Sequence, residues 1–572
     1  MNIFIRTAKY FSLSVFCLLF ALPLVESVNR SVALLVLVIF SLILSAKILR
    51  RSFVGGLPSI LFLIFVIWTV LILPFSSSLY YSLAEVLRYL AYLLIFIYVS
   101  QLEDEAKNKA RRLLYFSLIF NSTVLTLFAV IYKFIPRLPL PHGMNLFFAS
   151  FGHNRISAVL ILAIPVLIFN YPINGKKWLN MGFLVLFTGM LLLSGGRGAN
   201  LSLAASLVAI LFFKDPNLLK YSRKSAKAVV AASFVFVIFT YFYSEFLNLS
   251  GRPAGYYKPF RFEQRTGYFL QSLSGFRQSP LIGNGPDTFR YISQKYQTQP
   301  LSWSWYAHNF ILQLLSDTGL IGVLLFVLFL CISLQLFLRS FFSGPGSRQV
   351  LTALTVLFVS LMHNLMDYDW QFLSLMLYFL IFLALVVPKG KKFQIRLPLF
   401  FILLLLTAGT VGSLVLPTTE KRMQNAEKLI DKGDFDGARK VLSDGLIWDG
   451  SNRELYLKSA EIYWMRGYAD MAHVLLSRAI ELNMLDSESL LKKDYLYYIS
   501  QAEDAFNQDN PDKAYAYLSI STRLCPVFHF HLNRDFPADY DFRAYLESAK
   551  KNVQSISFSP EEVKSCAANI IH

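Results

Sequence analysis

Long apolar runs separated by short polar loops occupy the first 416 residues of the chain. A run of about 17 to 25 apolar residues is long enough to cross the hydrocarbon core of a bilayer as an α-helix. Such runs lie near residues 10–28, 31–49, 57–75, 80–99, 113–135, 156–172, 178–194, 199–213, 226–244, 309–338, 350–368, 371–387 and 398–416. The pattern predicts an all-α, polytopic membrane bundle of about 12 to 13 transmembrane helices.

The pattern turns polar after Pro417, which divides the chain into a membrane domain at 1–416 and a tail domain at 417–572. Within the tail, small and apolar residues recur with a period of about 34 residues, the tetratricopeptide signature. They are Ala426, Gly433, Ala438 and Leu442, then Ala460, Gly467, Ala472 and Leu476, and in a looser third copy Ala502, Ala514, Leu518 and Pro526. The tail is therefore predicted to be a tetratricopeptide-like helical array that could bind a protein partner; three generic amphipathic hairpins are the alternative.

Composition supports the membrane reading, because the chain is 55% hydrophobic and only 16% charged. One soluble core could not bury that much apolar surface. The net charge of +18 does not indicate nucleic-acid binding, since the basic residues sit mostly in short loops between the apolar runs. Membrane lipid head groups and phosphates are the expected partners.

The distribution of Lys and Arg predicts the topology. Arg6 and Lys9 precede the first run and no small-residue cleavage site follows it, which indicates a retained first helix with a cytoplasmic amino terminus. By the positive-inside rule, the long loop at 245–307, the short SGGRGAN loop and the tail then lie on the outer side. Function should be sought there.

The four cysteines show no metal-ligand spacing and no disulfide framework. Cys17 and Cys331 fall in apolar runs, whereas Cys525 and Cys566 fall in the tail. The tail allows one disulfide, and no metal site is predicted.

The long outer loop is rich in arginine and lysine, against the positive-inside rule. Its segment RFEQRTGYFLQSLSGF predicts an amphipathic helix with Arg261 and Arg265 on one face. Guanidinium groups fit phosphate oxygens. For Arg261, Arg277 and Arg290, a solvated or head-group-contacting face is the more economical explanation.

Two further residues stand at predicted helix boundaries on the outer side. Arg197 lies among glycines where a helix begins, an arrangement suited to an anion, although a lone arginine there is often a membrane anchor. His308 follows WSWYA and precedes an apolar run, so its imidazole could exchange a proton near neutral pH or simply cap the helix.

Other charged residues admit simpler explanations. Glu85 and Arg88 are one helical turn apart in an apolar run, which predicts a pair that eases the burial of both charges. Asp367 and Asp369 lie beside His363 at an outer border. They could line the same cavity as His308, but the sequence assigns them no catalytic role.

The chain resembles the O-antigen ligase family, which includes O-antigen ligases, polysaccharide polymerases and protein O-oligosaccharyltransferases. The motif HNFILQLLSDTGLIG, with His308, Asn309, Gly319 and Gly322, looks like the segment around the family's catalytic histidine. SGGRGAN, FGHNRISAVLILAIPV and EQRTGYFLQSLSGFRQSPLIGNGPDTF are also similar to family segments and occur in the same order. The resemblance covers about residues 151–370, and the tetratricopeptide-like tail leaves the acceptor open.

The resemblance implies a membrane glycosyltransferase of the bacterial inner membrane, with its active site and tail on the outer side. The donor would be a glycan on polyprenyl pyrophosphate, and neither metal nor other cofactor would be needed. His308 would be the general base toward an acceptor hydroxyl, and Arg197 and Arg265, with Arg261 as a further candidate, would hold the pyrophosphate.

Several alternatives remain within and outside this class. A ligase, a polysaccharide polymerase and a protein O-oligosaccharyltransferase need the same donor site and the same base, and differ only in a lipid, glycan or protein acceptor. A flippase or transporter of the lipid-linked glycan is the alternative of another class. Transporters, however, usually place ionisable groups at mid-membrane, whereas the notable residues here cluster at one border. A non-catalytic scaffold would not explain the ordered motifs.

Overall fold

The computed structural model describes the chain in separate stretches, nearly all of them helical. They are residues 18–26, 30–49, 54–134, 152–169, 177–212, 223–249, 262–299, 301–343, 348–388, 393–394, 418–508, 510, 512–514, 516–517, 550 and 559–571. The helices of the apolar part are α2 (Arg30–Leu49), α3 (Leu57–Leu71), α4 (Leu79–Ser100), α5 (Asp104–Phe134), α7 (Gly152–Phe169), α8 (Lys177–Leu193), α9 (Arg197–Leu211), α11 (Arg223–Leu249), α12 (Phe262–Gln278), α13 (Phe289–Lys295), α14 (Phe310–Ser343), α15 (Arg348–Asn364) and α16 (Leu373–Val386).

Short elements complete the apolar part. Two 3-10 turns, η1 (Leu73–Phe75) and η4 (Asp369–Gln371), follow α3 and precede α16. Two strands of two residues each, β1 (Val54–Gly55) and β2 (Phe393–Gln394), pair antiparallel, with Val54 opposite Gln394 and Gly55 opposite Phe393. The prediction of an all-α membrane protein is confirmed.

The helices fall where the apolar runs predict them. Among the described residues, three helices are long and apolar enough to cross a membrane: Leu79–Ser100, Asp104–Ile131 and Phe310–Phe341. Shorter apolar helices cover Arg30–Leu42, Leu57–Leu71, Arg155–Phe169, Lys177–Leu193, Arg197–Leu211 and Leu373–Val386. The predicted run at 398–416 lies outside the described residues, as does the start of the run at 10–28. The number of crossings therefore stays a prediction.

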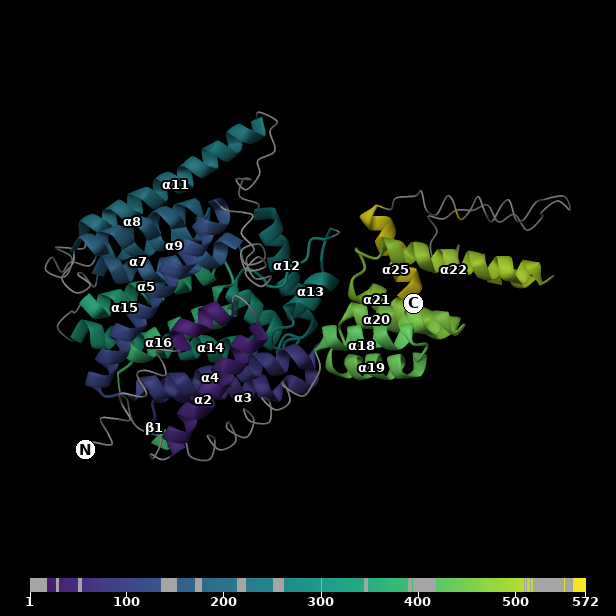
Figure 1. Ribbon diagram of the computed structural model, residues 1–572, viewed down its shortest axis with the longest axis horizontal. Coiled ribbons are helices and arrows are strands. Elements are labelled where there is room, and N and C mark those ends of the chain that lie inside the picture. The colour runs from purple at the N-terminus through teal and green to yellow at the C-terminus, as the bar shows by residue number, and fades with distance from the viewer. Residues whose placement is uncertain are drawn as a thin grey trace.

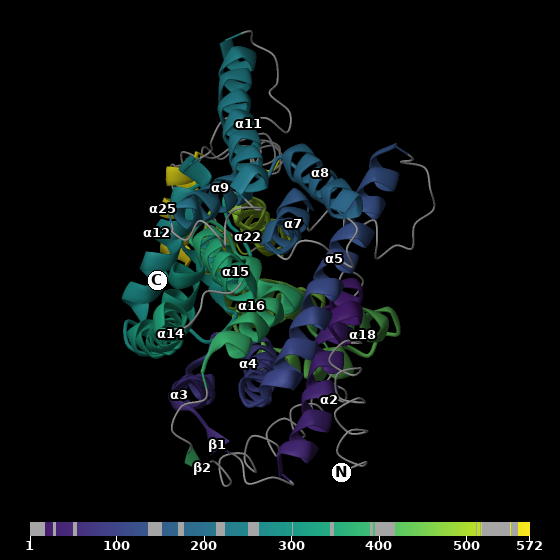
Figure 2. The same cartoon turned by 90° about the vertical axis from the view of Figure 1, so that its left-hand side faces the viewer.

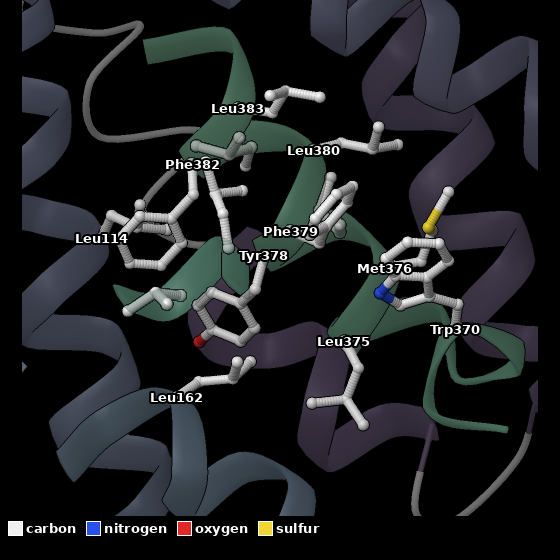
Figure 3. Close-up of a cluster of buried hydrophobic side chains, with 14 of the residues drawn as sticks. Leu114, Leu162, Trp370, Leu375, Met376, Tyr378, Phe379, Leu380, Phe382 and Leu383 are labelled. Atoms are coloured by element: carbon white, nitrogen blue, oxygen red, sulfur yellow. The ribbon is translucent and has the colours of Figure 1, made fainter. Parts of the chain in front are cut away.

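Helix α16 lies at the centre of the apolar part (Figures 1 and 2). Every residue from Leu373 to Leu385 is buried, which is why its sequence is apolar on all faces rather than on one stripe. Figure 3 shows its side chains projecting in several directions, with Phe379 beside Trp370 and Phe382 beside Leu114. Helices α4, α5, α14 and α15 pack against it.

Two buried ion pairs lie in the apolar part, as expected for charges removed from water. Glu85 and Arg88 form the predicted ion pair on α4, and both side chains are buried. Arg155, which precedes the predicted run at 156–172, lies inside α7, where its Nη2 is 3.1 Å from the Glu26 carboxylate. These pairs tie α4 to η4 and α7 to the start of α16, as described below.

Helix α15 ends earlier than the predicted run at 350–368. Its last residue is Asn364, because the Asn364 side chain accepts a hydrogen bond from the Trp370 amide (2.9 Å) and turns the chain back. Asp367 therefore lies in a loop between α15 and η4 rather than in a helix.

The tail contains α18 (Thr419–Asp431), α19 (Phe435–Trp448), α20 (Arg453–Met465), α21 (Ala469–Leu482), α22 (Glu488–Asn507) and α25 (Pro560–Ile571). Gly433 and Gly467, at equivalent positions of the period, both adopt left-handed φ values of 76° and 77° in the turns between helices. The small residues of the period, Ala426, Ala438, Ala460 and Ala472, are buried. This agrees with the predicted hairpins, whereas Leu518 and Pro526 of the third copy lie outside the described residues.

The cysteines divide between free and bonded states. Cys331 is a free thiol, and Cys566 is disulfide-bonded, in keeping with the one tail disulfide that the sequence allows. Cys17 and Cys525 lie outside the described residues.

Candidate functional site

His308 lies in the short segment that precedes α14, with its backbone in the left-handed region at φ 52°. Its Nδ1 is 3.2 Å from Oδ1 of Asp367. Because an ionised carboxylate can only accept hydrogen bonds, Nδ1 must carry a proton, and the lone pair of the neutral ring is then on Nε2. The Asp367 contact therefore selects the tautomer in which Nε2 can act as a base.

Two aromatic side chains fix the plane of the His308 ring. Tyr268 of α12 stacks on it with a centroid distance of 5.4 Å and an interplanar angle of 19°. Tyr368 meets it edge to face at 4.8 Å and 88°. With Asp367 on one nitrogen and a ring on either side, the imidazole is held in one orientation although its side chain keeps 18% exposure.

Asn309 joins the loops on both sides of the site. Its side-chain oxygen accepts from the Leu312 amide (3.0 Å), which caps the first turn of α14. Its Nδ2 donates to the carbonyl oxygen of Leu365 (2.9 Å), in the loop that carries Asp367. Asn309 therefore sets the distance between the histidine and its carboxylate.

Asp367 is buried and serves two partners at once. Its Oδ1 faces His308, and its Oδ2 is 3.5 Å from Nη2 of Arg265. Burial alone raises the pKa of this carboxyl, but the hydrogen bond from His308 and the electrostatic interactions with His308, His363 and Arg265 outweigh it and hold the pKa well below its usual range. Asp367 is thus a carboxylate at every physiological pH.

Arg265 reaches the same loop from α12, the helix predicted in the outer loop. Its Nη1 donates to the Met366 carbonyl oxygen, while Nη2 faces Asp367. One guanidinium fork thus spans two adjacent acceptors, and about a third of the side chain remains exposed. The exposed part is open to a further anion.

Arg197 is the first residue of α9, where helix-dipole and free backbone amides favour an anion. Gly195 before it adopts φ 74°. A Cβ atom on Gly198 would lie 3.6 Å from His363 Nε2 and 3.9 Å from Met366 Cβ, so this helix start packs against the Asp367 loop. Burial, followed by repulsion from Arg265, lowers the pKa of the Arg197 guanidinium. Arg197 and Arg265 are therefore near enough to repel each other, and together they make this end of the helices positively charged.

The glycines of the histidine motif have a structural role. Gly319 kinks α14 with φ 67° and ψ −174°, and a Cβ there would meet the Leu281 carbonyl oxygen at 2.3 Å. The kink exposes backbone groups that bind the glycine-rich turn of the outer loop: Gly285 N donates to Asp317 O at 2.9 Å. A Cβ on Gly322 would meet the Thr318 side chain. Both glycines permit a close approach that fixes the start of α14.

The chain that follows the Asp367 loop, η4 and the first residues of α16, is held by the buried charge pairs. Arg88 Nη1 donates to the carbonyl oxygens of Trp370 and Gln371, both at 3.0 Å. Glu26 accepts from the amides of Leu373 and Ser374. These bonds satisfy backbone carbonyl and amide groups that have no access to water within the apolar part.

The other predicted residues lie elsewhere. Arg261 is outside the described residues. Arg277 is exposed at the end of α12. Arg290, expected on a solvated or lipid-facing surface, is buried instead, with its guanidinium 3.2 Å from the centroid of the Tyr81 ring. Arg290 is therefore a packing residue.

Sequence reasoning assigned no role to Asp367, Tyr268 or Tyr368. Asp367 stands in the motif HNLMDYDW at a predicted outer border. Its contact with His308, however, joins segments far apart in the chain, and no periodic pattern of the sequence predicts such a contact. Within the part of the chain that the structure describes, no group of three or more His, Cys, Asp or Glu residues could hold a metal ion. Metal independence stays a prediction.

The fold and the site define an all-α membrane protein with a histidine, a carboxylate and two arginines gathered at one end of its helices. Residues 182–327 match the family model described as O-antigen ligase. This match supports the resemblance to the O-antigen ligase family and to its type of membrane glycosyltransferase. The matched segment contains Arg197, Arg265 and His308 but ends before Asp367 and the tail. No curated protein matches the chain.

Proposed function

We propose that the chain transfers a preassembled glycan from polyprenyl pyrophosphate to an acceptor hydroxyl. The observation that carries the proposal is that His308 and Arg265 share the two oxygens of one buried carboxylate, Asp367, beside the helix start at Arg197. A candidate base and two candidate pyrophosphate-binding arginines thus lie within one small site, as the transfer of a glycan from a phosphate leaving group requires.

In the proposed reaction, Nε2 of His308 takes the proton from the acceptor hydroxyl as the oxygen attacks the anomeric carbon of the donor glycan. The bond between that carbon and the pyrophosphate oxygen breaks, and polyprenyl pyrophosphate leaves with the electron pair. Asp367 stabilises the imidazolium that forms. The proton returns to solvent or to the departing phosphate.

Arg197 and Arg265 are proposed to hold the pyrophosphate. Negative charge on the leaving oxygen grows as the glycosidic bond breaks, and fixed cations that are already in place stabilise it without reorganising. The mutual repulsion of the two guanidinium groups supports this role, because a bound anion would relieve it. No metal ion is needed for charge neutralisation in this scheme.

The proposed location is the outer face of a bacterial cytoplasmic membrane, with many crossings and the tail on the same side as His308. The Lys and Arg distribution between loops supports it. The direct contacts of α13 with the tail agree with one common side for both.

The acceptor decides between the members of the class, and one experiment separates them. Purified protein in lipid nanodiscs is given a defined lipid-linked oligosaccharide alone, or with a lipid A core acceptor, or with an acceptor protein. A ladder from donor alone identifies a polymerase, and a product that requires the core or the protein identifies a ligase or an O-oligosaccharyltransferase. EDTA should leave the rate unchanged.

The same assay tests the flippase alternative. A transporter would move the lipid-linked glycan across a proteoliposome membrane without forming any new glycosidic bond. Protection of the glycan from an externally added glycosidase would report that movement. Glycan movement without any transfer product, with all three acceptors, would overturn the enzyme proposal.

A further inference from the structure

Helix α13 and the residues just after it bind the tail at two equivalent positions of its repeat. The Tyr291 hydroxyl donates to Oδ1 of Asp449 at 2.5 Å, and Nε2 of Gln297 donates to Oδ1 of Asn483 at 2.5 Å. Asp449 and Asn483 are the residues that end α19 and α21. They lie one repeat period apart, so the loop contacts the same turn in two successive hairpins.

The contacts are buried and their charge is balanced. Tyr291, Gln297, Asp449 and Asn483 are all buried, and Asp449 has no exposed surface. Arg290 donates to the Tyr291 hydroxyl at 2.9 Å, and that hydroxyl donates in turn to Asp449. The relay offsets the cost of removing the Asp449 carboxylate from water.

The second carboxylate oxygen of Asp449, Oδ2, accepts two further hydrogen bonds. Thr419 donates to Oδ2 at 3.1 Å and Asn452 donates at 2.9 Å. Arg290 also lies over the ring of Tyr81 in α4 and 4.8 Å from the centroid of Trp305. One network therefore links the membrane helices, the outer loop and the tail.

The tail also holds the segment that leads to His308. Asp486, in the turn after α21, accepts from the Leu301 amide at 2.7 Å, and Leu301 has a left-handed φ of 57°. The Ser304 amide donates to Ser293 Oγ at 2.8 Å. Ser293 is on α13. The contacts that hold α13 against the tail therefore also fix the position of the segment 301–307.

We propose that the tail is a positioning part of the active site, in which Asp449, Asn483 and Asp486 hold α13 and the segment 301–307 so that His308 faces Asp367. The inference rests on the role proposed for His308. Loss of these contacts would let the histidine leave its orientation, which lowers the rate of the chemical step while the arginines still bind the donor. We therefore expect a change in kcat rather than in KM.

The test uses loop-side variants that leave the tail residues intact. Tyr291→Phe and Gln297→Leu, alone and combined, remove the two bonds that these side chains make to the tail; Tyr291→Phe also removes the bond that Arg290 donates to Tyr291. Matched controls are Tyr296→Phe and Gln278→Leu, which break an exposed hydrogen bond of 2.9 Å within the outer loop. All variants are made in the full chain and checked for expression and melting temperature.

The first readout does not depend on activity. Hydrogen–deuterium exchange of a peptide spanning residues 299–309 reports the amides of Leu301 and Ser304. We expect exchange about tenfold faster in the combined variant, the loss expected for one or two hydrogen bonds, and unchanged exchange in the controls. Unchanged exchange in the combined variant would overturn the inference, whatever its activity.

The second readout is the transfer rate. The combined variant should lose about tenfold in kcat, with KM for the donor within twofold of wild type, and the controls should match wild type. Faster exchange with normal kcat would also overturn the positioning role. If the wild-type chain shows no transfer at all, the proposed function fails, whereas the exchange experiment still decides whether the tail holds the His308 segment.

Discussion

At the scale of single residues, the environment of His308 distinguishes a base from a helix cap. The ring is held by Asp367, Tyr268 and Tyr368, whereas the helix cap is supplied by the neighbouring Asn309. Since the capping bond does not involve the imidazole, the histidine is free for proton transfer. The capping role is thus filled by Asn309, and the base role stays the proposal for His308.

His308→Ala should lower turnover by on the order of 10² to 10⁴, the range for lost general acid–base catalysis. Donor binding should persist because both arginines remain. His308→Gln keeps a polar side chain that does not titrate near neutral pH, and it should be equally inactive. Steady-state transfer at matched expression is the measurement, and near-normal transfer by the glutamine variant would exclude the base role.

Arg265→Lys should lower kcat/KM by roughly 10- to 100-fold, the cost of losing a hydrogen bond to a charged group. Arg265 spans Met366 O and Asp367 with one fork, which a single ammonium group cannot reproduce. Arg277→Lys, an exposed position on the same helix, is the control. Equal losses in the two variants would mean that α12 acts only through its total charge.

Asp367→Asn should reduce turnover on the order of 10² or more, because the imidazolium loses its counter-charge and the tautomer is no longer fixed. The depressed pKa of Asp367 also sets the pH dependence of stability. A carboxylate with a lowered pKa stabilises the fold above its ordinary value of about 3.9, and this contribution is lost as pH falls through the lowered pKa.

The melting temperature of Asp367→Asn should accordingly lie below that of wild type by the same amount between about pH 5 and 8. The difference should shrink only on stronger acidification. Differential scanning fluorimetry across this range is the measurement. A difference that disappears between pH 7 and 5 would show that Asp367 is not held as a carboxylate by its partners.

At the scale of elements, the kink in α14 is the feature to which the outer loop is hydrogen-bonded. Gly319 takes a conformation that side chains rarely adopt, and the chain around it bonds to the turn at 279–285. A straight helix would offer no free backbone groups at this point. The kink is therefore required for docking of the loop that carries Arg265.

Gly319→Ala should cost about 1 to 3 kcal/mol of stability, the usual range for a strained backbone position, because a Cβ would also meet Leu281 O at 2.3 Å. Gly189→Ala, in the middle of α8 with no atom within 4 Å of an added Cβ, should be neutral or stabilising by about 0.5 to 1 kcal/mol. Thermal unfolding in detergent measures both. Equal melting temperatures would contradict a specific requirement for glycine at the kink.

The elements could largely be predicted from the sequence, since each apolar run with described residues forms a helix. The site could be predicted only in part. Arg197, Arg265 and His308 stand at helix boundaries that periodicity reveals, but Asp367 was hidden inside an apolar run whose helix ends early at Asn364. Arg290 was misplaced because loop composition does not show that Tyr81, 3.2 Å away, comes from another helix.

At the scale of the whole molecule, the contacts of α13 with the tail connect the two parts of the chain (Figure 1). Topology is a separate matter, because it depends on loop charges rather than on packing. The side of the membrane on which this joint lies is therefore open to direct measurement.

Cysteine labelling should place the tail outside and the loop before α11 inside. In a Cys331→Ser background, Ser451→Cys should react with a membrane-impermeant maleimide in intact cells, and Ser225→Cys should react only after lysis. The prediction rests on the positive-inside rule. Labelling of Ser225→Cys in intact cells would reverse the proposed orientation and exclude a shared outer side for the active site.

The buried pair of Glu26 and Arg155 has a consequence for biosynthesis. Glu26 emerges from the ribosome long before Arg155, and an unpaired carboxylate is costly in hydrocarbon. The segment at 18–26 must therefore stay near the translocon or at the lipid interface until α7 has been made. We therefore expect insertion of this chain not to proceed strictly helix by helix, and nascent chains that end before Arg155 to be substrates for membrane quality control.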